Sequence, residues 1–184
     1  MDNGEINYRR FLDGDDEGMV ELIRIYKDGL MLYLNGITGN IFLAEEIMED
    51  TFFRLVTKKP KFSGRSSFKT WLYAIGRNTA IDSLRKRSRF SEKSIDEYND
   101  LAGEESIEQE YLIQEQKILL HKALRKLNPD YRQVLYLVFF ENFSNSETAK
   151  IMHKSKRQVE NLLYRAKQSL KSELEKEGFK YEVI

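Results

Sequence analysis

Between Phe62 and Arg89 the chain concentrates cations, an amide and aromatic side chains, which are the groups that bind nucleic acid. The polar members of this set are Lys69, Arg77, Asn78, Arg85, Lys86, Arg87 and Arg89. Ammonium and guanidinium groups pair with backbone phosphates, and aromatic rings stack on bases that have left a duplex. The residue types therefore favour contact with a nucleic-acid backbone and with unstacked bases.

An apolar stripe in the same stretch predicts how these groups are held. Its side chains recur at helical spacing and share one face, namely Phe68, Trp71, Leu72, Ile75, Ile81 and Leu84. A short loop from Phe62 to Ser67 precedes them, with Ser66 or Ser67 as a suitable N-cap. We expect one long helix with a core face and a basic face. Trp71 fits the core face by its phase, and we favour that placement over contact with DNA.

Charge is strongly segregated along the chain, although the formal net charge of all 184 residues is zero. Residues 58–89 carry ten cations against one anion, and residues 111–184 carry a net charge of +5. Residues 1–57 and 90–110 each carry a net charge of −7. This pattern predicts two basic surfaces joined by an acidic linker.

Composition narrows the fold and the chemistry. Ten glycines and two prolines in 184 residues favour a mainly helical protein, because both residues disfavour helices. The absence of cysteine excludes disulfides and thiol chemistry, and His121 and His153 lack neighbours at metal-ligand spacing. No phosphate-binding loop or nucleophile motif is present, so we expect neither an enzyme nor a cofactor. With no signal peptide and no long apolar run, we expect no membrane insertion and a cytoplasmic location.

The predicted fold is all-α, with two small helical domains and a flexible acidic linker. The boundaries that we expect are 10–90 for the first domain, 91–110 for the linker and 111–176 for the second domain. In the first domain, one helix starts at Asp13 to Asp16 and breaks near Asn35-Gly36 and Gly39-Asn40. A second helix is predicted from about Ile41 to Thr57, before the long helix.

Phe53 lies among charges on the outer side of the Ile41–Thr57 helix. Its neighbours there include Glu45, Glu46, Glu49, Asp50 and Arg54. An exposed aromatic beside acidic side chains suits a protein-docking surface. Alternatively, Phe53 fills a second, minor core, and the sequence pattern leaves both interpretations open.

The second domain has the proportions of a helix-turn-helix around His153 to Ser155. Ala149 is small where the first helix approaches the second, and the turn Asn128-Pro129-Asp130 supplies the N-cap of an earlier helix. The final helix directs polar groups outward, namely Lys156, Arg157, Glu160, Asn161, Tyr164, Arg165 and Lys167. Arginine suits guanine edges, asparagine suits adenine and glutamate accepts from cytosine. DNA binding in the major groove is therefore one interpretation, and an ordinary helical hairpin is the other.

Two blocks of sequence together resemble the sigma-70 family in its extracytoplasmic-function branch. AEEIMEDTFFRLV followed by FSGRSSFKTWLYAIGRNTAIDSLRKRSR resembles region 2, and ALRKLNPDYRQVLYLVFFENFSNSETAKIMHKSKRQVENLLYRAKQSLKSEL resembles region 4. The resemblance implies a sigma factor that directs core RNA polymerase to promoter DNA. It also implies inhibition by an anti-sigma factor, and a monomer when the chain is free.

The resemblance assigns residues to three contacts. The polymerase-binding face would be Glu46, Glu49, Asp50, Phe53 and Arg54. In the −10 element, a flipped base would contact Phe62 and Asn78. The rest of this element would contact residues along the long helix, namely Lys69, Trp71, Tyr73, Arg77, Arg85, Lys86, Arg87 and Arg89. The −35 element would meet Arg157, Glu160, Asn161, Tyr164 and Arg165, with Lys156 and Lys167 beside them. Glu160 replaces a basic residue that is common in the family, which should alter sequence preference.

A free-standing helix-turn-helix regulator with a helical N-terminal domain is the alternative function. It accounts equally well for residues 111–184. It leaves the aromatic and basic helix after Phe62 without a role. The oligomeric state also separates the two functions, because regulators of that type are usually dimers. A sigma factor should instead bind polymerase one to one.

Overall fold

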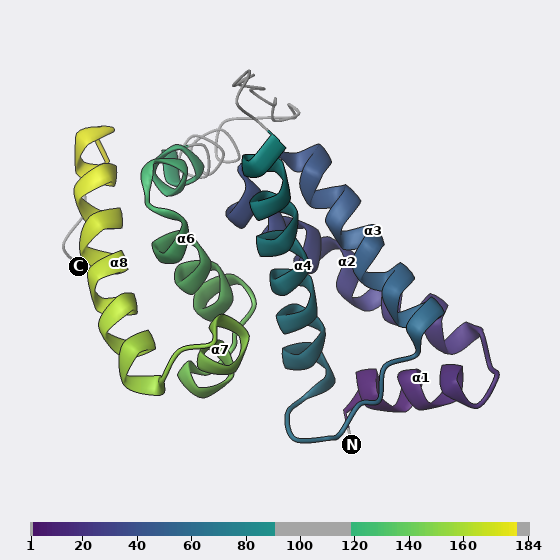
Figure 1. The fold of residues 1–184 in the computed structure, drawn as a ribbon. Coiled ribbons are helices and arrows are strands. Elements are labelled where there is room, and N and C mark those ends of the chain that lie inside the picture. The colour runs from purple at the N-terminus through teal and green to yellow at the C-terminus, as the bar shows by residue number, and fades with distance from the viewer. Residues whose placement is uncertain (1, 91–118, 180–184) are drawn as a thin grey trace, which may run out of the picture.

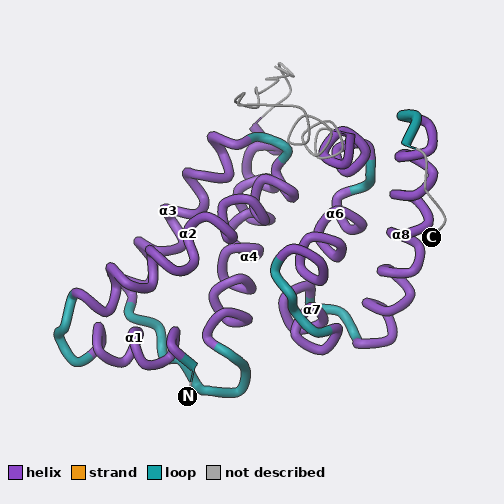
Figure 2. Tube along the Cα trace, turned by 180° about the vertical axis from the view of Figure 1, so that it is seen from behind, coloured by secondary structure: helices purple, strands orange, loops and turns teal. Residues whose placement is uncertain are grey.

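The computed structural model describes residues 2–90 and 119–179, and every regular element in these two ranges is helical (Figure 2). We call residues 2–90 the N-terminal half and residues 119–179 the C-terminal half. The predicted linker at 91–110, and residues 111–118 of the predicted second domain, lie outside the described residues. None of the helices within the described ranges combines the length and apolar composition needed to cross a bilayer.

The N-terminal half consists of four helices, which Figure 1 shows on its right-hand side. Their bounds are α1 Asn3–Leu12, α2 Glu17–Thr38, α3 Ile41–Lys58 and α4 Phe68–Phe90. The sequence prediction contained only the last three. Residues 3–12 are too few to show a clear apolar period, yet Tyr8 and Phe11 of α1 are buried against the other helices.

Helix α2 is longer than its glycines suggest, because it continues through Gly36 and ends at Gly39. Gly39 adopts a left-handed conformation with φ 67°, and its N–H donates to the carbonyl of Asn35. This geometry is typical of a C-terminal helix cap. The break predicted at Asn35-Gly36 was wrong, since burial of Tyr33, Leu34 and Ile37 holds the last turn in place.

Helix α4 begins at Phe68, where two side chains cap it. Ser67 Oγ accepts from Thr70 N at 3.2 Å, which confirms Ser67 as an N-cap. Asp2 accepts through one carboxylate oxygen from Phe68 N at 2.8 Å and through the other from Glu5 N at 2.7 Å. A single carboxylate therefore caps both α1 and α4, and it ties the start of the chain to the start of the long helix.

Aromatic rings form the end of the core nearest this capped junction. Phe68 lies within 5.4 to 5.9 Å of the rings of Tyr8, Tyr26, Phe62 and Trp71. The Tyr8 hydroxyl donates to the Pro60 carbonyl at 2.7 Å and so holds the loop before α4. Burial raises the pKa of Tyr8 to about 12, so this hydroxyl stays protonated at physiological pH.

The C-terminal half consists of shorter helices that precede one long helix. Residues 119–126 are helical, followed by α6 Pro129–Leu135, the π-helical turn η1 Tyr136–Phe140, α7 Asn145–Met152 and α8 Lys156–Lys176. Asn128 caps α6 as expected, accepting from Tyr131 N at 2.9 Å. Ser144 and Ser155 each form a capping box, with Glu147 and Gln158 respectively. These caps set the boundaries of the helix-turn-helix.

The two halves pack against each other along α2 and α4 (Figure 1). Helix α4 contacts α7, and α2 contacts α6. Tyr73 of α4 packs edge-on against Phe143 with ring centroids 5.1 Å apart, and Tyr33 of α2 lies 6.3 Å from Tyr136. Helix α4 is thus covered on two sides, by its own bundle and by the C-terminal half.

Candidate nucleic-acid and polymerase interfaces

Three donors on α4 occur one turn apart and face the C-terminal half. Lys69, Tyr73 and Arg77 are spaced by four residues, so they share one face of the helix. Lys69 Nζ lies 2.8 Å from Glu141 Oε2, and the Tyr73 hydroxyl donates to the same oxygen at 2.8 Å. Arg77 Nε donates to Gln133 Oε1 at 2.9 Å. All three were assigned to DNA, and all three bond here to oxygens of the C-terminal half.

Tyr73 is the most deeply covered of the predicted DNA-contacting residues, with 1% of its surface exposed. Burial, followed by the charge and hydrogen bond of Glu141, raises the pKa of its hydroxyl far above the usual range. The hydroxyl therefore remains a donor throughout the physiological pH range. The resemblance assigned Tyr73 to the −10 element, but the sequence could not show that a second domain covers this position.

The N-terminal end of α4 meets the N-terminal end of α7 through Glu147. Its Oε1 accepts from Thr70 Oγ1 at 3.2 Å and from Ser67 Oγ at 3.4 Å, while its Oε2 accepts from Ser144 N at 3.0 Å. Burial alone would raise the pKa of this carboxyl, but the hydrogen bonds from Ser144, Thr70 and Ser67 outweigh it and lower the pKa. Glu147 is thus an ionised link between the halves.

The two residues assigned to a flipped base do not lie in one cluster. Phe62 is half-buried, with its ring 5.2 Å from Trp71 and 5.8 Å from Phe68. Asn78 lies about two turns beyond Trp71 along α4, and its Oδ1 is 3.0 Å from His153 Nε2. Trp71 is also partly buried and packs against the core, as its helical phase predicted.

The cations at the C-terminal end of α4 are exposed, in contrast to those nearer its start. Arg85, Lys86, Arg87 and Arg89 all present their side chains to solvent. Arg85 lies 3.8 Å from Asp82, and Arg87 Nη2 bonds to Glu46 Oε2 of α3 at 3.1 Å. Exposed pairs of this kind contribute little to stability and exchange readily. This cluster therefore remains accessible to a phosphate backbone.

Helix α3 presents an acidic and apolar outer face, on which Phe53 is 66% exposed. This exposure excludes the minor-core alternative for Phe53. Glu46, Glu49, Asp50 and Arg54 are exposed beside it. Phe42, 63% exposed, and Val56, 40% exposed, extend the same face by helical spacing and were missed as site residues. Phe42 lies eleven residues before Phe53 and Val56 lies three residues after it. These helical spacings place both on the face of Phe53, and they could have been used to predict them.

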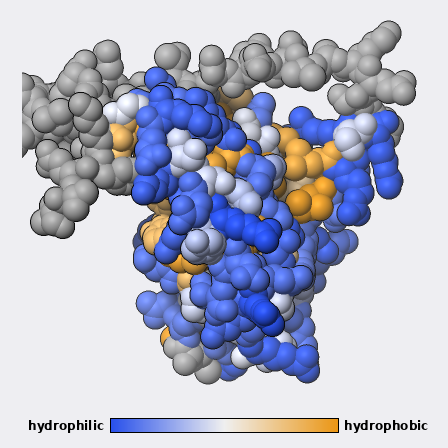
Figure 3. Space-filling view, turned by 90° about the vertical axis from the view of Figure 1, so that its left-hand side faces the viewer, coloured by the Kyte–Doolittle hydropathy of each residue, from blue (hydrophilic) through white to orange (hydrophobic). Residues whose placement is uncertain are grey.

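Helix α8, the second helix of the helix-turn-helix, is exposed along its first half. Val159 and Ala166 are buried and anchor α8 against the domain, and Ala149 is buried where α7 approaches. The side chains assigned to base and phosphate contact all face solvent, namely Lys156, Arg157, Glu160, Asn161, Tyr164, Arg165 and Lys167. Tyr164 is the most exposed of the large hydrophobic residues there, at 67%. Figure 3, which views the α8 side of the molecule, shows a mainly hydrophilic face.

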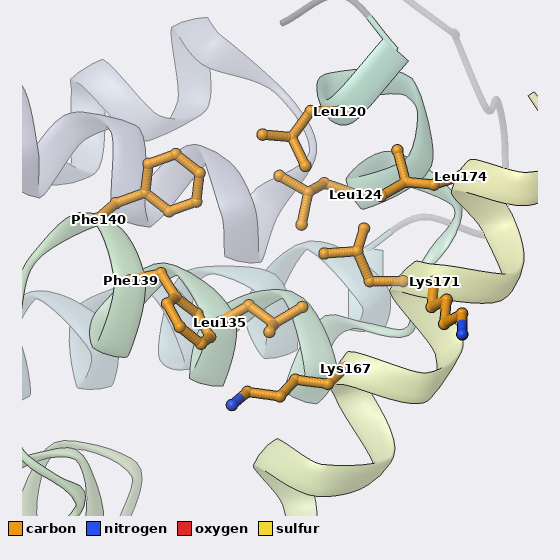
Figure 4. Close-up of a pocket in the computed structure, with 9 residues that line it drawn as sticks. Leu120, Leu124, Leu135, Phe139, Phe140, Lys167, Lys171 and Leu174 are labelled. Atoms are coloured by element: carbon orange, nitrogen blue, oxygen red, sulfur yellow. The ribbon is translucent and has the colours of Figure 1, made fainter. Parts of the chain in front are cut away.

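Lys167 differs from its six companions because it borders an apolar cavity. Its Nζ lies 5.1 Å from the centroid of the Phe139 ring. The cavity, of about 350 Å³, opens between residues 119–126, η1 and α8 (Figure 4). Leucines and phenylalanines line it, with Lys167 and Lys171 at its edge. Sequence reasoning missed this cavity, since the leucines that form it are ordinary core positions.

No group of three metal-ligating side chains occurs in residues 2–90 and 119–179. Glu141 and Glu147 instead bond to lysine, tyrosine, serine and threonine. These two carboxylates therefore take part in hydrogen bonds and a charge pair.

Comparisons with known proteins match both halves. The model of sigma-70 region 2 matches residues 22–90, and that of sigma-70 region 4 matches residues 117–170. SigW of Bacillus subtilis, described as an extracytoplasmic-function RNA polymerase sigma factor, is 24% identical over 88% of this chain and 91% of its own length. SigX of the same organism, with the same description, is 28% identical over 71% of this chain and 70% of its own length. The structure of RpoE from Bartonella quintana with the anti-sigma factor NepR superposes with a TM-score of 0.69, at 23% identity, covering 84% of this chain and 95% of that one.

Proposed function

The chain belongs to the extracytoplasmic-function branch of the sigma-70 family of RNA polymerase sigma factors, and we propose how its surfaces divide the work of initiation. The outer face of α3 binds core polymerase. Helix α4 and the loop before it engage the melted −10 element, and α8 recognises the −35 element. The observation that carries this division is the exposure of Phe53 among acids on α3, on a different helix from either DNA surface.

Polymerase binding by α3 follows from the composition of its outer face. Phe42, Phe53 and Val56 offer apolar area, and Glu46, Glu49 and Asp50 offer negative charge around it. An apolar centre with a charged rim is the usual anatomy of a protein interface. Arg54 lies beside Phe53 and can pair with an acidic group of the partner.

The −10 assignment rests on the donors and rings of α4 and its preceding loop. Capture of a flipped base requires stacking and hydrogen bonds to the base edge. Phe62, supported by Trp71, offers the ring, and Asn78, about two turns beyond Trp71 on α4, offers its amide once His153 has moved away. Lys69, Tyr73 and Arg77 supply donors to the strand, and the exposed cations at the end of α4 hold its phosphates. Domain boundaries near 10–90 and 111–176 accommodate both surfaces.

The −35 assignment rests on α8, whose first half enters the major groove in this motif. Arg157, Glu160 and Asn161 are placed to contact base edges, and Lys156 is placed to contact phosphate. Lys167 lies farther along the helix, against Phe139, and contributes to long-range attraction rather than to a base contact.

A protein partner that inhibits the chain fits the same surfaces. RpoE of Bartonella quintana was solved with the anti-sigma factor NepR, and we propose that an anti-sigma factor also binds this chain. The protein acts in the cytoplasm, as a monomer when free, and has no catalytic chemistry of its own.

The test of polymerase binding is a pull-down of core RNA polymerase with the full chain. Phe53→Ala combined with Asp50→Ala should abolish one-to-one binding. Tyr164→Ala is the matched control, since Tyr164 is as exposed as Phe53 but lies on α8. It should bind core polymerase like the unmodified chain, and circular dichroism should show that all variants are folded. Equal binding by both variants would contradict the assignment to α3.

A further inference from the structure

We propose that the N-terminal half carries an anion site which Glu141 of the C-terminal half occupies, and which takes a backbone phosphate of single-stranded DNA when the halves separate. The site is formed by Gly29 of α2 with Lys69 and Tyr73 of α4, and we call it the anion socket. The inference rests on the proposed function only for the identity of the DNA. Occupation by Glu141 makes the closed structure self-inhibited.

The socket holds Glu141 by three polar contacts, two to its carboxylate and one to its backbone carbonyl. Lys69 Nζ bonds to its Oε2 at 2.8 Å, and the same ammonium donates to the backbone carbonyl of Glu141 at 2.9 Å. The Tyr73 hydroxyl completes the set at 2.8 Å. The side chain of Glu141 is only 12% exposed and that of Lys69 is 32% exposed. Partial burial strengthens this pair relative to those on the surface.

Gly29 makes room for the carboxylate on the opposite side. A Cβ at this position would lie 2.6 Å from Glu141 Oε1 and 2.7 Å from the Tyr73 hydroxyl. Any side chain on Gly29 would therefore displace the anion. Gly36 of the same helix has no such neighbour, since a Cβ there would meet nothing within 4 Å.

The rest of the α4 face is covered in the same manner. Gln133 presents its amide oxygen to Arg77, and Glu147 presents a carboxylate oxygen to Thr70. The C-terminal half thus sets oxygen acceptors against donors that recur along α4. Lys69, Tyr73 and Arg77 follow one another at about 6 Å, from about 1.5 Å per residue. A row of donors at this interval suits a chain of phosphates, for which Glu141 and its companions substitute.

Phosphate is the ligand class that the socket selects. An ammonium and a hydroxyl converge on one oxygen, and the notch at Gly29 leaves space for a second. A tetrahedral phosphodiester has two non-bridging oxygens that share one negative charge. One oxygen can accept from Lys69 and Tyr73, and the other can lie in the notch at Gly29. Phosphodiester binding is independent of base sequence. The socket should therefore bind any single strand, and its use requires that Glu141 has left.

The experiment measures DNA affinity and the separation of the halves on the full chain. The protein has no cysteine, so Asp13→Cys and Ser172→Cys, both exposed, allow a dye pair to be attached just after α1 and on α8. Fluorescence anisotropy of a 20-residue oligothymidylate reports binding. Glu141→Gln should increase the inter-dye distance and tighten DNA binding about five- to tenfold, because it raises the fraction of open chains.

Four further variants test the socket itself. Glu175→Gln makes the same charge change on an exposed part of α8 and should alter neither readout. Lys69→Met added to Glu141→Gln should keep the halves apart but remove the gain in DNA affinity. Gly29→Ala should separate the halves with a smaller gain in affinity, because its methyl group narrows the socket, whereas Gly36→Ala should change neither.

Two results would overturn the proposal. One is an equal effect of Glu141→Gln and Glu175→Gln, which would reduce the effect to net charge. The other is a gain in DNA affinity that persists without Lys69. Neither result bears on polymerase binding through α3, so a failure here is distinguishable from a failure of the proposed function.

Discussion

The two surfaces assigned to DNA differ in whether they are accessible. On α8, Tyr164 is 67% exposed and its neighbours face solvent, whereas Tyr73 on α4 is 1% exposed and lies under the other half. The structure therefore presents the helix that would recognise a duplex and covers much of the helix that would hold a single strand. This difference matches the order of initiation, in which duplex DNA is met before strands are separated.

The cause of the difference lies in how each helix is anchored. Helix α8 buries a narrow apolar stripe, including Val159 and Ala166, and keeps the rest of its circumference polar. Helix α4 buries Phe68 and Leu72 toward its own bundle and Tyr73 toward the other half. A helix packed on two sides can expose its donors only if one covering layer moves. The two halves thus differ in what must happen before each binds DNA.

The largest expected effect tests whether the halves share one core. Phe68→Ala removes a fully buried ring and should lower the free energy of unfolding by about 3–5 kcal/mol. Leu137→Ala in the C-terminal half should cost about 2–5 kcal/mol. Urea unfolding followed by circular dichroism measures both. If the halves are one unit, each variant shifts a single transition; two separate transitions would show that the halves are independent.

The next effect tests the accessible surface. Asn161→Ala should cost about 1–3 kcal/mol of binding to the preferred −35 duplex and relax preference at one base pair. Lys156→Ala should weaken binding to all duplexes alike and reduce the salt dependence. Binding to a panel of single-base duplex variants, selected first with the unmodified protein, distinguishes the two. A uniform loss from Asn161→Ala would remove its role in sequence recognition.

A smaller effect tests the cap that also joins the halves. Ser144→Ala removes the N-cap of α7 and should cost about 0.5–2 kcal/mol of stability. Asn40→Ala removes the N-cap of α3, which lies away from the other half, and should cost a similar amount. Only the Ser144 variant should also change the inter-dye distance, because it loosens Glu147. If the inter-dye distance were the same in the Ser144→Ala and Asn40→Ala variants, the Ser144 cap would stabilise α7 alone and would not join the halves.

Acid should separate the halves in part through Glu147. Its pKa is lowered in the folded protein, so its contribution is fully present above the ordinary pKa of about 4.3 and is lost as the pH falls through the lowered value. The inter-dye distance measured between pH 6 and pH 3 should increase in that window. Glu147→Gln should flatten this part of the curve, and an unchanged curve would assign the acid response to other carboxyls.

The smallest effect compares two glycines of α2. Gly36→Ala should raise stability by up to about 1 kcal/mol, since the site is helical and open. Gly39→Ala should lower stability, because φ at this position is 67°. Thermal unfolding measures both changes. A loss of stability in Gly36→Ala would contradict the open surroundings of this position.

Much of each helix was predictable because its determinants are local. Apolar period and cap residues located α3 and α8, and Ser67 and Asn128 cap the helices that they were expected to cap. Helix α1 was not predictable, since its burial depends on α2 and α4 rather than on its own period. The extension of α2 through Gly36 has the same origin, because distant packing outweighs a local helix breaker.

The sequence predicted which residues form each surface, but it could not predict which of those residues are buried. The outer face of α3 follows from helical phase, so Phe53 and its acids lie where the pattern places them. Burial of Tyr73 depends on Phe143 and Glu141, about seventy positions away in the sequence, and no local pattern contains that contact. The socket at Gly29 could not be inferred either, because a helical glycine has no sequence signature for the partner that approaches it.

The double cap at Asp2 has a consequence for the order of events during synthesis. Phe68, whose N–H donates to Asp2, follows Asp2 by 66 positions. The first turn of α1 therefore leaves the ribosome long before this partner of Asp2. Contacts between such distant positions form late and slow folding. Helix α1 should therefore join the nascent bundle only after α4 has emerged, and the start of the chain becomes one of the last parts of this half to be fixed.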